Sequence, residues 1–187
     1  MPYIDRTLRP YRDYDEKNVI NIAAITGTDL PVNKGSLVKL VRGLQTDQDP
    51  TEMLGSFGTF TVSNTVSQRY GVTPKIQVTQ TGDNPFGMTL FDIREVDENG
   101  EILKYHPHKA AEMEACLSGW SVPIVTRGTF VYSGAETTGT ITPGQSAYAS
   151  ANGLVSVNAG SGNVKIGKFM GPTGADGSVF FWLNIQN

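Results

Sequence analysis

The C-terminal segment from Ser118 to Asn187 places the strongest limit on how this chain can fold. Short apolar runs recur along it, glycine-bearing turns separate them, and no long helical pattern is present. Runs of this length between turn residues are typical of β-strands in barrels and sandwiches. From Gly119 onward only five residues are charged: Arg127, Glu136, Lys165, Lys168 and Asp176. We therefore expect a weakly charged β-unit that packs and makes contacts.

Upstream of this segment, β-branched and alternating runs predict further strands. They cover residues 19–25, 36–41, 59–66 and 75–79. Residues 43–58 have the composition of a loop or insertion, so residues 43–85 form either a smaller lobe or part of the same barrel. The fold class that follows is mainly β, a small barrel or sandwich.

Two Asn-Gly pairs predict tight turns, because both residue types tolerate positive φ. Asn99-Gly100 joins a run over residues 89–96 to a returning run over residues 101–105. The neighbouring carboxylates resemble the start of a calcium loop but lack its later ligands and spacing, so we interpret this segment as a turn. Asn152-Gly153 predicts a second hairpin.

One short α-helix is expected over about residues 107–117. Pro107 suits the first helical position, the following residues are mostly good helix formers, and Gly119 is a natural C-terminal stop. Ala110 and Cys116 fall near one face, which indicates contact with the core. A free cysteine of this kind is most often a small buried apolar residue.

Residues 1–17 are polar and aromatic, and their charges cancel. The segment cannot bury much of itself, and Pro10 interrupts any helix. It is either an ordinary frayed terminus or an extended arm that orders on a partner, since Tyr and Arg are enriched at interface anchors. We take residues 1–17 as the arm and residues 18–187 as a single β-rich domain. The candidate contact residues of the arm are Tyr3, Arg6, Arg9, Tyr11, Arg12 and Tyr14.

Composition argues against several classes of protein. A net charge of −3 over 187 residues disfavours a general nucleic-acid binder, because neutralising phosphates needs a basic surface. One cysteine excludes an internal disulfide framework. No apolar run reaches the roughly 18 residues of a transmembrane helix, and the N-terminus lacks a secretory apolar region. We expect synthesis in a cytoplasm and no membrane contact.

No pattern of catalytic residues stands out. Glycine motifs for phosphates or dinucleotides are missing, and Gly119-Trp120-Ser121 lacks the second glycine of a nucleophile elbow. His106 and His108 have no further histidine to complete a metal site. Trp182 lies in an apolar strand, which favours a place in the core. We expect no enzyme, no cofactor and no metal.

Several C-terminal motifs together resemble those of a known family. They are Thr142-Pro143-Gly144-Gln145-Ser146-Ala147-Tyr148, Asn152-Gly153-Leu154-Val155, Ile166-Gly167-Lys168-Phe169, Ala175-Asp176-Gly177-Ser178-Val179 and Trp182-Leu183. This pattern is similar to that of tailed-bacteriophage head decoration, or capsid cement, proteins. Stretches between residues 97 and 128 also resemble structural proteins of marine and cyanobacterial phages. The resemblance covers residues 86–187.

The resemblance implies a non-enzymatic protein on the outer surface of a phage head. Its partner would be the major capsid protein, whose subunits it would clamp together, and it would assemble as a homotrimer. Two alternatives stay open at this point. One is another virion component, such as a neck, tail or head-fibre base protein. The other is a virion-surface glycan-binding module or depolymerase-like enzyme, which would need Trp120 or Trp182 exposed to stack on sugar.

Overall fold

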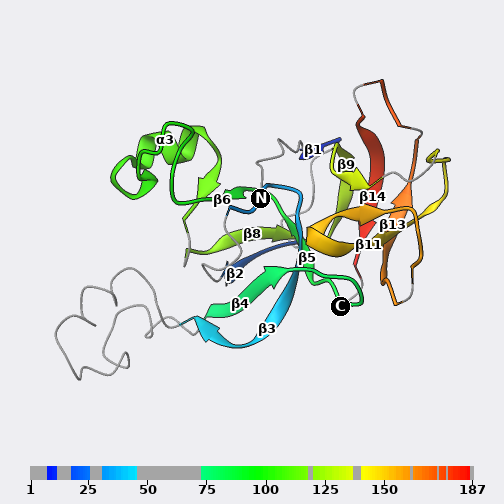
Figure 1. Ribbon diagram of the computed structural model, residues 1–187, viewed down its shortest axis with the longest axis horizontal. Helices are drawn as coiled ribbons and strands as arrows, with labels where there is room; N and C mark the ends of the chain where they lie inside the picture. Colours follow the sequence, from blue (N-terminus) through cyan, green and yellow to red (C-terminus); the bar gives the residue numbers. More distant parts are fainter. Residues whose placement is uncertain are drawn as a thin grey trace.

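The computed structural model describes residues 8–11, 18–25, 31–45, 73–117, 120–136, 140–160, 162–171, 173–175 and 177–185. These residues form a mainly β structure, as expected, with a closed five-stranded barrel packed beside a seven-stranded sheet (Figure 1). A small lobe carrying the helix α3 (Pro107–Glu112) lies at the end of the molecule away from the sheet.

The barrel closes in the strand order β2-β4-β3-β5-β8. All of its pairs are antiparallel except β2 with β4. Apolar side chains such as Val38, Ile76 and Ile124 are fully buried inside it. The strands are β2 (Val19–Ile25), β3 (Leu37–Gln45), β4 (Thr73–Val78), β5 (Gly87–Thr89) and β8 (Val122–Val125).

The sheet has the strand order β1-β9-β14-β13-β11-β12-β10. Burial alternates strictly along β14, so Val179, Phe181 and Leu183 enter the core and the residues between them face outward. The strands are β1 (Leu8–Pro10), β9 (Arg127–Tyr132), β10 (Ala135–Glu136), β11 (Ser146–Ala149), β12 (Val155–Ser156), β13 (Lys165–Phe169) and β14 (Val179–Asn184).

One hydrophobic core joins the barrel to the sheet. Leu37 and Met88 of the barrel pack in the same buried cluster as Tyr132 and Phe181 of the sheet. Gly153, between β11 and β12, lies directly against the barrel at this contact. Its N–H donates a hydrogen bond to the carbonyl of Thr79 at 3.0 Å, and a Cβ there would lie 3.0 Å from the Leu37 carbonyl oxygen. The two parts therefore fold as a unit.

The predicted hairpin at Asn152-Gly153 is confirmed. Both residues have positive φ, 57° and 68°, and they connect β11 to β12, which pair antiparallel. A short 3-10 helix over Ala151–Gly153 forms the turn. The last predicted strand is also confirmed, as β14.

The lobe around α3 differs from the prediction in two ways. The helix ends at Glu112, not near residue 117, because Glu114 turns the chain at φ 50° and Ala115–Cys116 form a strand, β7. That strand pairs parallel with β6 (Asp92–Ile93). The expected return strand over residues 101–105 is instead a bridge between Val96 and Ile102, followed by a 3-10 helix over Leu103–Tyr105. The lobe's own small apolar cluster, formed by Leu103, Ala110 and Leu117, favours this arrangement.

Part of the predicted arm belongs to the domain. Residues 8–10 are extended, but they form the edge strand β1 and pair with β9. Leu8 is buried in the shared core, and the Tyr11 N–H donates to the Thr129 carbonyl at 2.9 Å. The other residues of the arm lie outside the described residues.

The expected insertion over residues 43–85 is described only at its ends. β3 continues to Gln45, past the predicted start of the loop, and β4 begins at Thr73, so both ends belong to the barrel. Residues 46–72, including the predicted strand over residues 59–66, lie outside the described part of the chain. Among the described residues, no helix is long and apolar enough to cross a membrane.

We predict that Gly153→Ala destabilises the fold by about 2 kcal/mol, because a left-handed backbone is strained for alanine and its Cβ would crowd β3 and β4. Urea unfolding followed by circular dichroism measures the change. Gly144→Ala is the matched control, since Gly144 also has positive φ but a Cβ added there would have no other atom within 4 Å. An equal decrease in the free energy of unfolding for the two variants would show that crowding against β3 does not contribute to the destabilisation.

Candidate functional site

The outward side of the seven-stranded sheet, called here the outer face, gathers aromatic, polar and cationic side chains. Residues opposite each other on neighbouring strands share a face. Trp182 of β14 therefore lies between Lys168 of β13 and Thr129 of β9. Asn184 lies opposite Arg127 in the same way. The register thus brings together residues that are far apart in the sequence.

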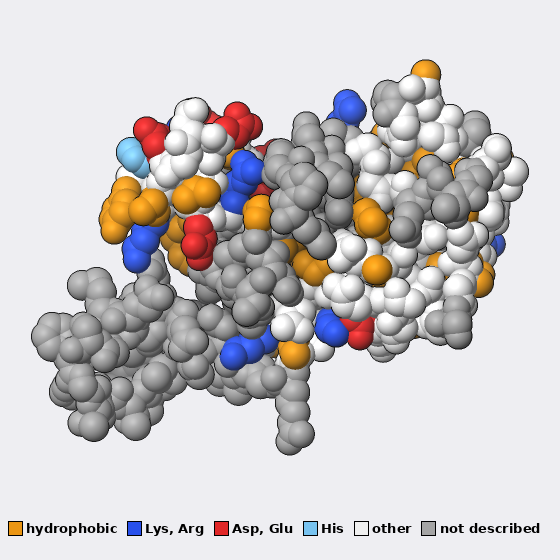
Figure 2. Space-filling view, viewed as in Figure 1, with side chains coloured by type: hydrophobic (Ala, Val, Ile, Leu, Met, Phe, Trp, Pro, Cys, Tyr) orange, Lys and Arg blue, Asp and Glu red, His pale blue; other side chains and the backbone are white. Residues whose placement is uncertain are grey.

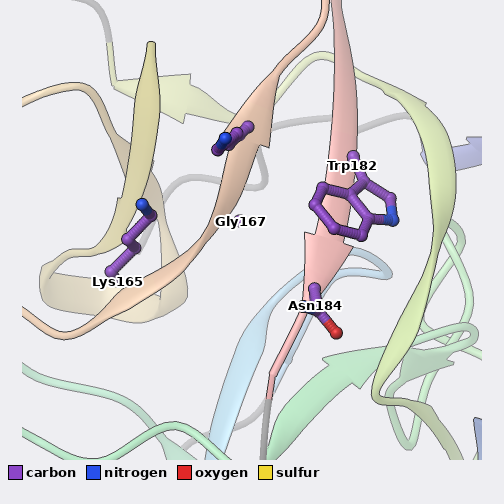
Figure 3. A pocket seen from close by; sticks show the side chains of 5 residues that line it. Lys165, Gly167, Trp182 and Asn184 are labelled. Atoms are coloured by element: carbon purple, nitrogen blue, oxygen red, sulfur yellow. The ribbon is translucent and has the colours of Figure 1, made fainter. Parts of the chain in front are cut away.

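A pocket of about 330 Å³ opens on this face. It is lined by Lys165, Gly167, Lys168, Trp182 and Asn184, and Figure 3 shows Lys165 across the pocket from Trp182 and Asn184. A Cβ at Gly167 would come within 2.0 Å of the Trp182 carbonyl oxygen. Glycine therefore allows β13 and β14 to run close together at the pocket.

The outer face is cationic although the whole chain is acidic. The charged side chains that the structure describes on the strands of this sheet are Arg9, Arg127, Lys165 and Lys168, all positive. The net charge of the full chain is −3. These four cations favour an anionic ligand or partner on this face.

The expectation that Trp182 is a core residue is wrong. Its side chain is half-buried and points outward, while its neighbours Phe181 and Leu183 fill the core. The alternation of the run SVFFWLNI contains this signal, because period-2 burial puts every second residue outside. Because most residues of this run are apolar, its composition alone indicated a core position for Trp182. The other tryptophan, Trp120, is exposed.

A second surface lies on the α3 lobe. Three large apolar side chains are exposed there, and together they are called here the lobe patch: Val96 (45% exposed), Ile102 (50%) and Tyr105 (71%). Val96 and Ile102 are bridge partners, and the Tyr105 N–H donates to the Ile102 carbonyl, so the three are neighbours. Figure 2 shows hydrophobic side chains at the surface of this lobe, beside charged ones.

An ion-pair cluster braces the lobe beside this patch. Lys109 of α3 contacts the carboxylate of Asp97 and lies 2.9 Å from that of Glu101. The other Asp97 oxygen accepts hydrogen bonds from the N–H groups of Asn99 (2.8 Å) and Glu101 (2.7 Å). These bonds confirm the predicted turn, and they occupy the carboxylates of Asp97 and Glu101 in the segment that resembled the start of a calcium loop.

This cluster shifts the pKa values of its members. The hydrogen bond from Lys109 lowers the pKa of Asp97 below 3.8, against the opposing effect of burial, and the backbone N–H groups lower it further. The hydrogen bonds to Asp97 and then Glu101 raise the pKa of Lys109 to about 12. The pair is therefore charged over a wide range of pH, and α3 stays tied to the turn.

Cys116 is buried, as predicted, beneath the lobe. It is 7% exposed, and burial raises the pKa of its thiol to about 11. His106 and His108 are both exposed at the start of α3. Within the described ranges, no group of three or more His, Cys, Asp or Glu residues is placed to hold a metal ion.

Two of the six predicted arm residues can be located. Arg9 is exposed on the outer face, opposite Val131. Tyr11 is 61% exposed, and its ring packs edge-on against Phe180 with the ring centroids 4.5 Å apart. Tyr3, Arg6, Arg12 and Tyr14 lie outside the described residues. A contact role for the arm stays a prediction.

No protein-family model, curated protein or solved structure matches this chain. Its function therefore has to be inferred from its own surfaces. The pocket on the outer face offers an aromatic ring beside cations, which suits a small anionic ligand. The lobe patch offers apolar area on a braced support, which suits contact with another protein.

We predict that Asp97→Asn loosens the lobe. The pair is complete from pH 3.8 to 10.5, and its stabilisation is lost as the pH falls through the lowered pKa of Asp97 or rises through about 12. The variant should show faster amide hydrogen exchange in α3 at neutral pH, while the wild type should lose this protection only at the acid and alkaline ends of that range. Glu98→Gln, in the same turn, is the control. Unchanged exchange in Asp97→Asn would contradict a bracing role.

We also predict that Cys116 resists alkylation in the folded protein, because the thiolate is the reactive form and burial disfavours it. Mass spectrometry after iodoacetamide treatment should show slow labelling at neutral pH and fast labelling in urea.

The unfolded thiol ionises above about 9.0 and the folded one near 11. The free energy of unfolding should therefore decline between these pH values, and the decline should be smaller in Cys116→Ala. Rapid labelling of the native protein would contradict the burial.

Proposed function

We propose that this protein is a capsid decoration, or cement, protein of a tailed bacteriophage. It binds the outer surface of the phage head and stabilises contacts between major capsid protein subunits. The observation that carries the proposal is the lobe patch, an exposed apolar surface on a braced projection of a β-scaffold. The identity of the partner rests on the resemblance of residues 86–187 to phage head proteins.

The lobe patch suits a partner surface that forms only on assembly. Val96 and Ile102 are about half exposed, so covering the rest of either side chain contributes about 1 kcal/mol. A single contact of this size is weak. Repetition across a lattice makes it strong, because each bound copy holds its neighbours in place and many contacts act together.

The bracing of the lobe supports the same role. A surface that is ordered before binding loses less conformational entropy when it binds. Lys109 ties α3 to the turn that carries Asp97 and Glu101, and Val96 and Ile102 flank that turn. The apolar side chains are thus presented on a backbone that is already fixed.

The remaining parts of the proposal concern assembly and the arm. The protein acts as a homotrimer on the capsid surface of the virion, without enzymatic activity. The six Tyr and Arg residues of the N-terminal segment provide a second contact with the capsid. Arg9 and Tyr11 support this part of the proposal, because both are exposed at the edge of the sheet from which the segment continues.

We predict that Ile102→Asp weakens binding to the capsid about tenfold, or about 1.4 kcal/mol, because it puts a charge into an apolar contact. Co-sedimentation of the purified protein with expanded capsids that lack it measures the affinity. Leu40→Asp is the matched control, since Leu40 is 48% exposed but lies on β3 of the barrel. Sedimentation velocity on the same samples reports whether each variant stays trimeric.

The outcomes separate the parts of the proposal. Wild-type affinity in Ile102→Asp would show that the lobe patch is not the contact. Failure of the wild-type protein to bind capsids would contradict the cement function. Localisation of the protein to the neck, tail or head-fibre base in a virion reconstruction would assign it to that structure.

A further inference from the structure

We propose that the pocket on the outer face binds an acidic sugar residue, with Trp182 against the sugar ring and Lys165 and Lys168 at its carboxylate. The pocket is lined by residues of β13 and β14, and these strands lie at the opposite end of the molecule from the lobe that carries α3 (Figure 1). The inference therefore goes beyond attachment to a capsid and does not depend on it. A protein attached through its lobe would leave this pocket open to solvent.

Trp182 supplies the surface on which a sugar ring packs. The C–H groups on one side of a pyranose form a flat apolar patch, which stacks on an aromatic face as other apolar groups do. The indole of Trp182 is half-buried, so the surrounding strands hold it while part of it lines the pocket. Phe169 and Phe181, in contrast, are fully buried and serve the core.

The two lysines of the pocket differ from three other lysines of the protein. Lys34, Lys39 and Lys109 pair with Glu114, Asp83 and Asp97 respectively. Lys165 and Lys168 make no ion pair with any residue in the described part of the chain, and no carboxylate lines their pocket. Two cations beside one aromatic ring favour a ligand that carries an anion, because charge-assisted hydrogen bonds are stronger than neutral ones.

The remaining lining favours a sugar over a nucleic acid. The amide of Asn184 both donates and accepts hydrogen bonds, which suits hydroxyl groups. Single-stranded nucleic acids bind along grooves with successive aromatic platforms, whereas this pocket has one ring. Its volume of about 330 Å³ is near the lower limit for ligand sites and matches one or two sugar residues.

Fluorescence titration of a Trp120→Phe variant tests the proposal. The chain has two tryptophans, so this variant reports on Trp182 alone. The probes are digalacturonate against its methyl ester, and sialyllactose against lactose, so that each acid has a neutral match. At least one acid should give a saturable change in emission, with binding about tenfold tighter than its neutral match, and added salt should weaken it.

Variants of the lysines test the placement of the charge. In the Trp120→Phe background, Lys168→Ala should weaken binding of the acid about tenfold, and Lys165→Ala with Lys168→Ala should abolish the preference for acid over neutral probe. Lys75→Ala, on β4 of the barrel, is the control and should bind as the parent does. Circular dichroism confirms that each variant is folded.

Three results would overturn the proposal. The first is no saturable change with any probe up to about 10 mM. The second is equal affinity for acid and neutral probes, or no effect of Lys168→Ala. The third is tighter binding of oligothymidylate than of either acid, which would assign the pocket to single-stranded nucleic acid.

Discussion

The close packing of the sheet on the barrel is the contact on which the rest of the structure depends. Leu37 stands at its centre, buried between the two parts, with the backbone of Gly153 held against it. Gly35 makes a similar approach to the ring of Tyr132, where a Cβ would come within 2.8 Å. Both glycines also have positive φ. Small residues therefore bring the layers together, and large apolar residues fill the space between them.

This contact leaves the two surfaces with candidate functions outside the shared core. Because the sheet buries one side against the barrel, its outer face can carry Trp182 and the cations without loss to the core. The lobe has its own small buried cluster around Leu103, and Val96, Ile102 and Tyr105 lie outside that cluster. A docking surface and a ligand pocket can thus occupy separate ends of one small protein.

Much of the β-structure could be predicted from short-range pattern. Turn glycines and alternating runs predicted β14 and the hairpin at Asn152-Gly153, because both depend on residues close in sequence. The end of α3 could not be predicted in this way, since Cys116 leaves the helix to pair with Ile93, a contact between distant residues. The outer-face pocket depends on the register between β13 and β14, which no local pattern specifies. Trp182 is the partial exception, because alternation alone marks it as outward.

The place of β1 in the sheet has a consequence for how the chain reaches its native state. Leu8, near the start of the chain, pairs with Tyr132, and Val19 of β2 pairs with Val125. Strands β1 and β2 therefore cannot form these pairs until β9 and β8, which come much later in the sequence, have been synthesised. Contacts between such distant residues slow folding, because a long loop has to close before they form. The barrel and the sheet are thus completed only after β8, β9 and β14 have been synthesised.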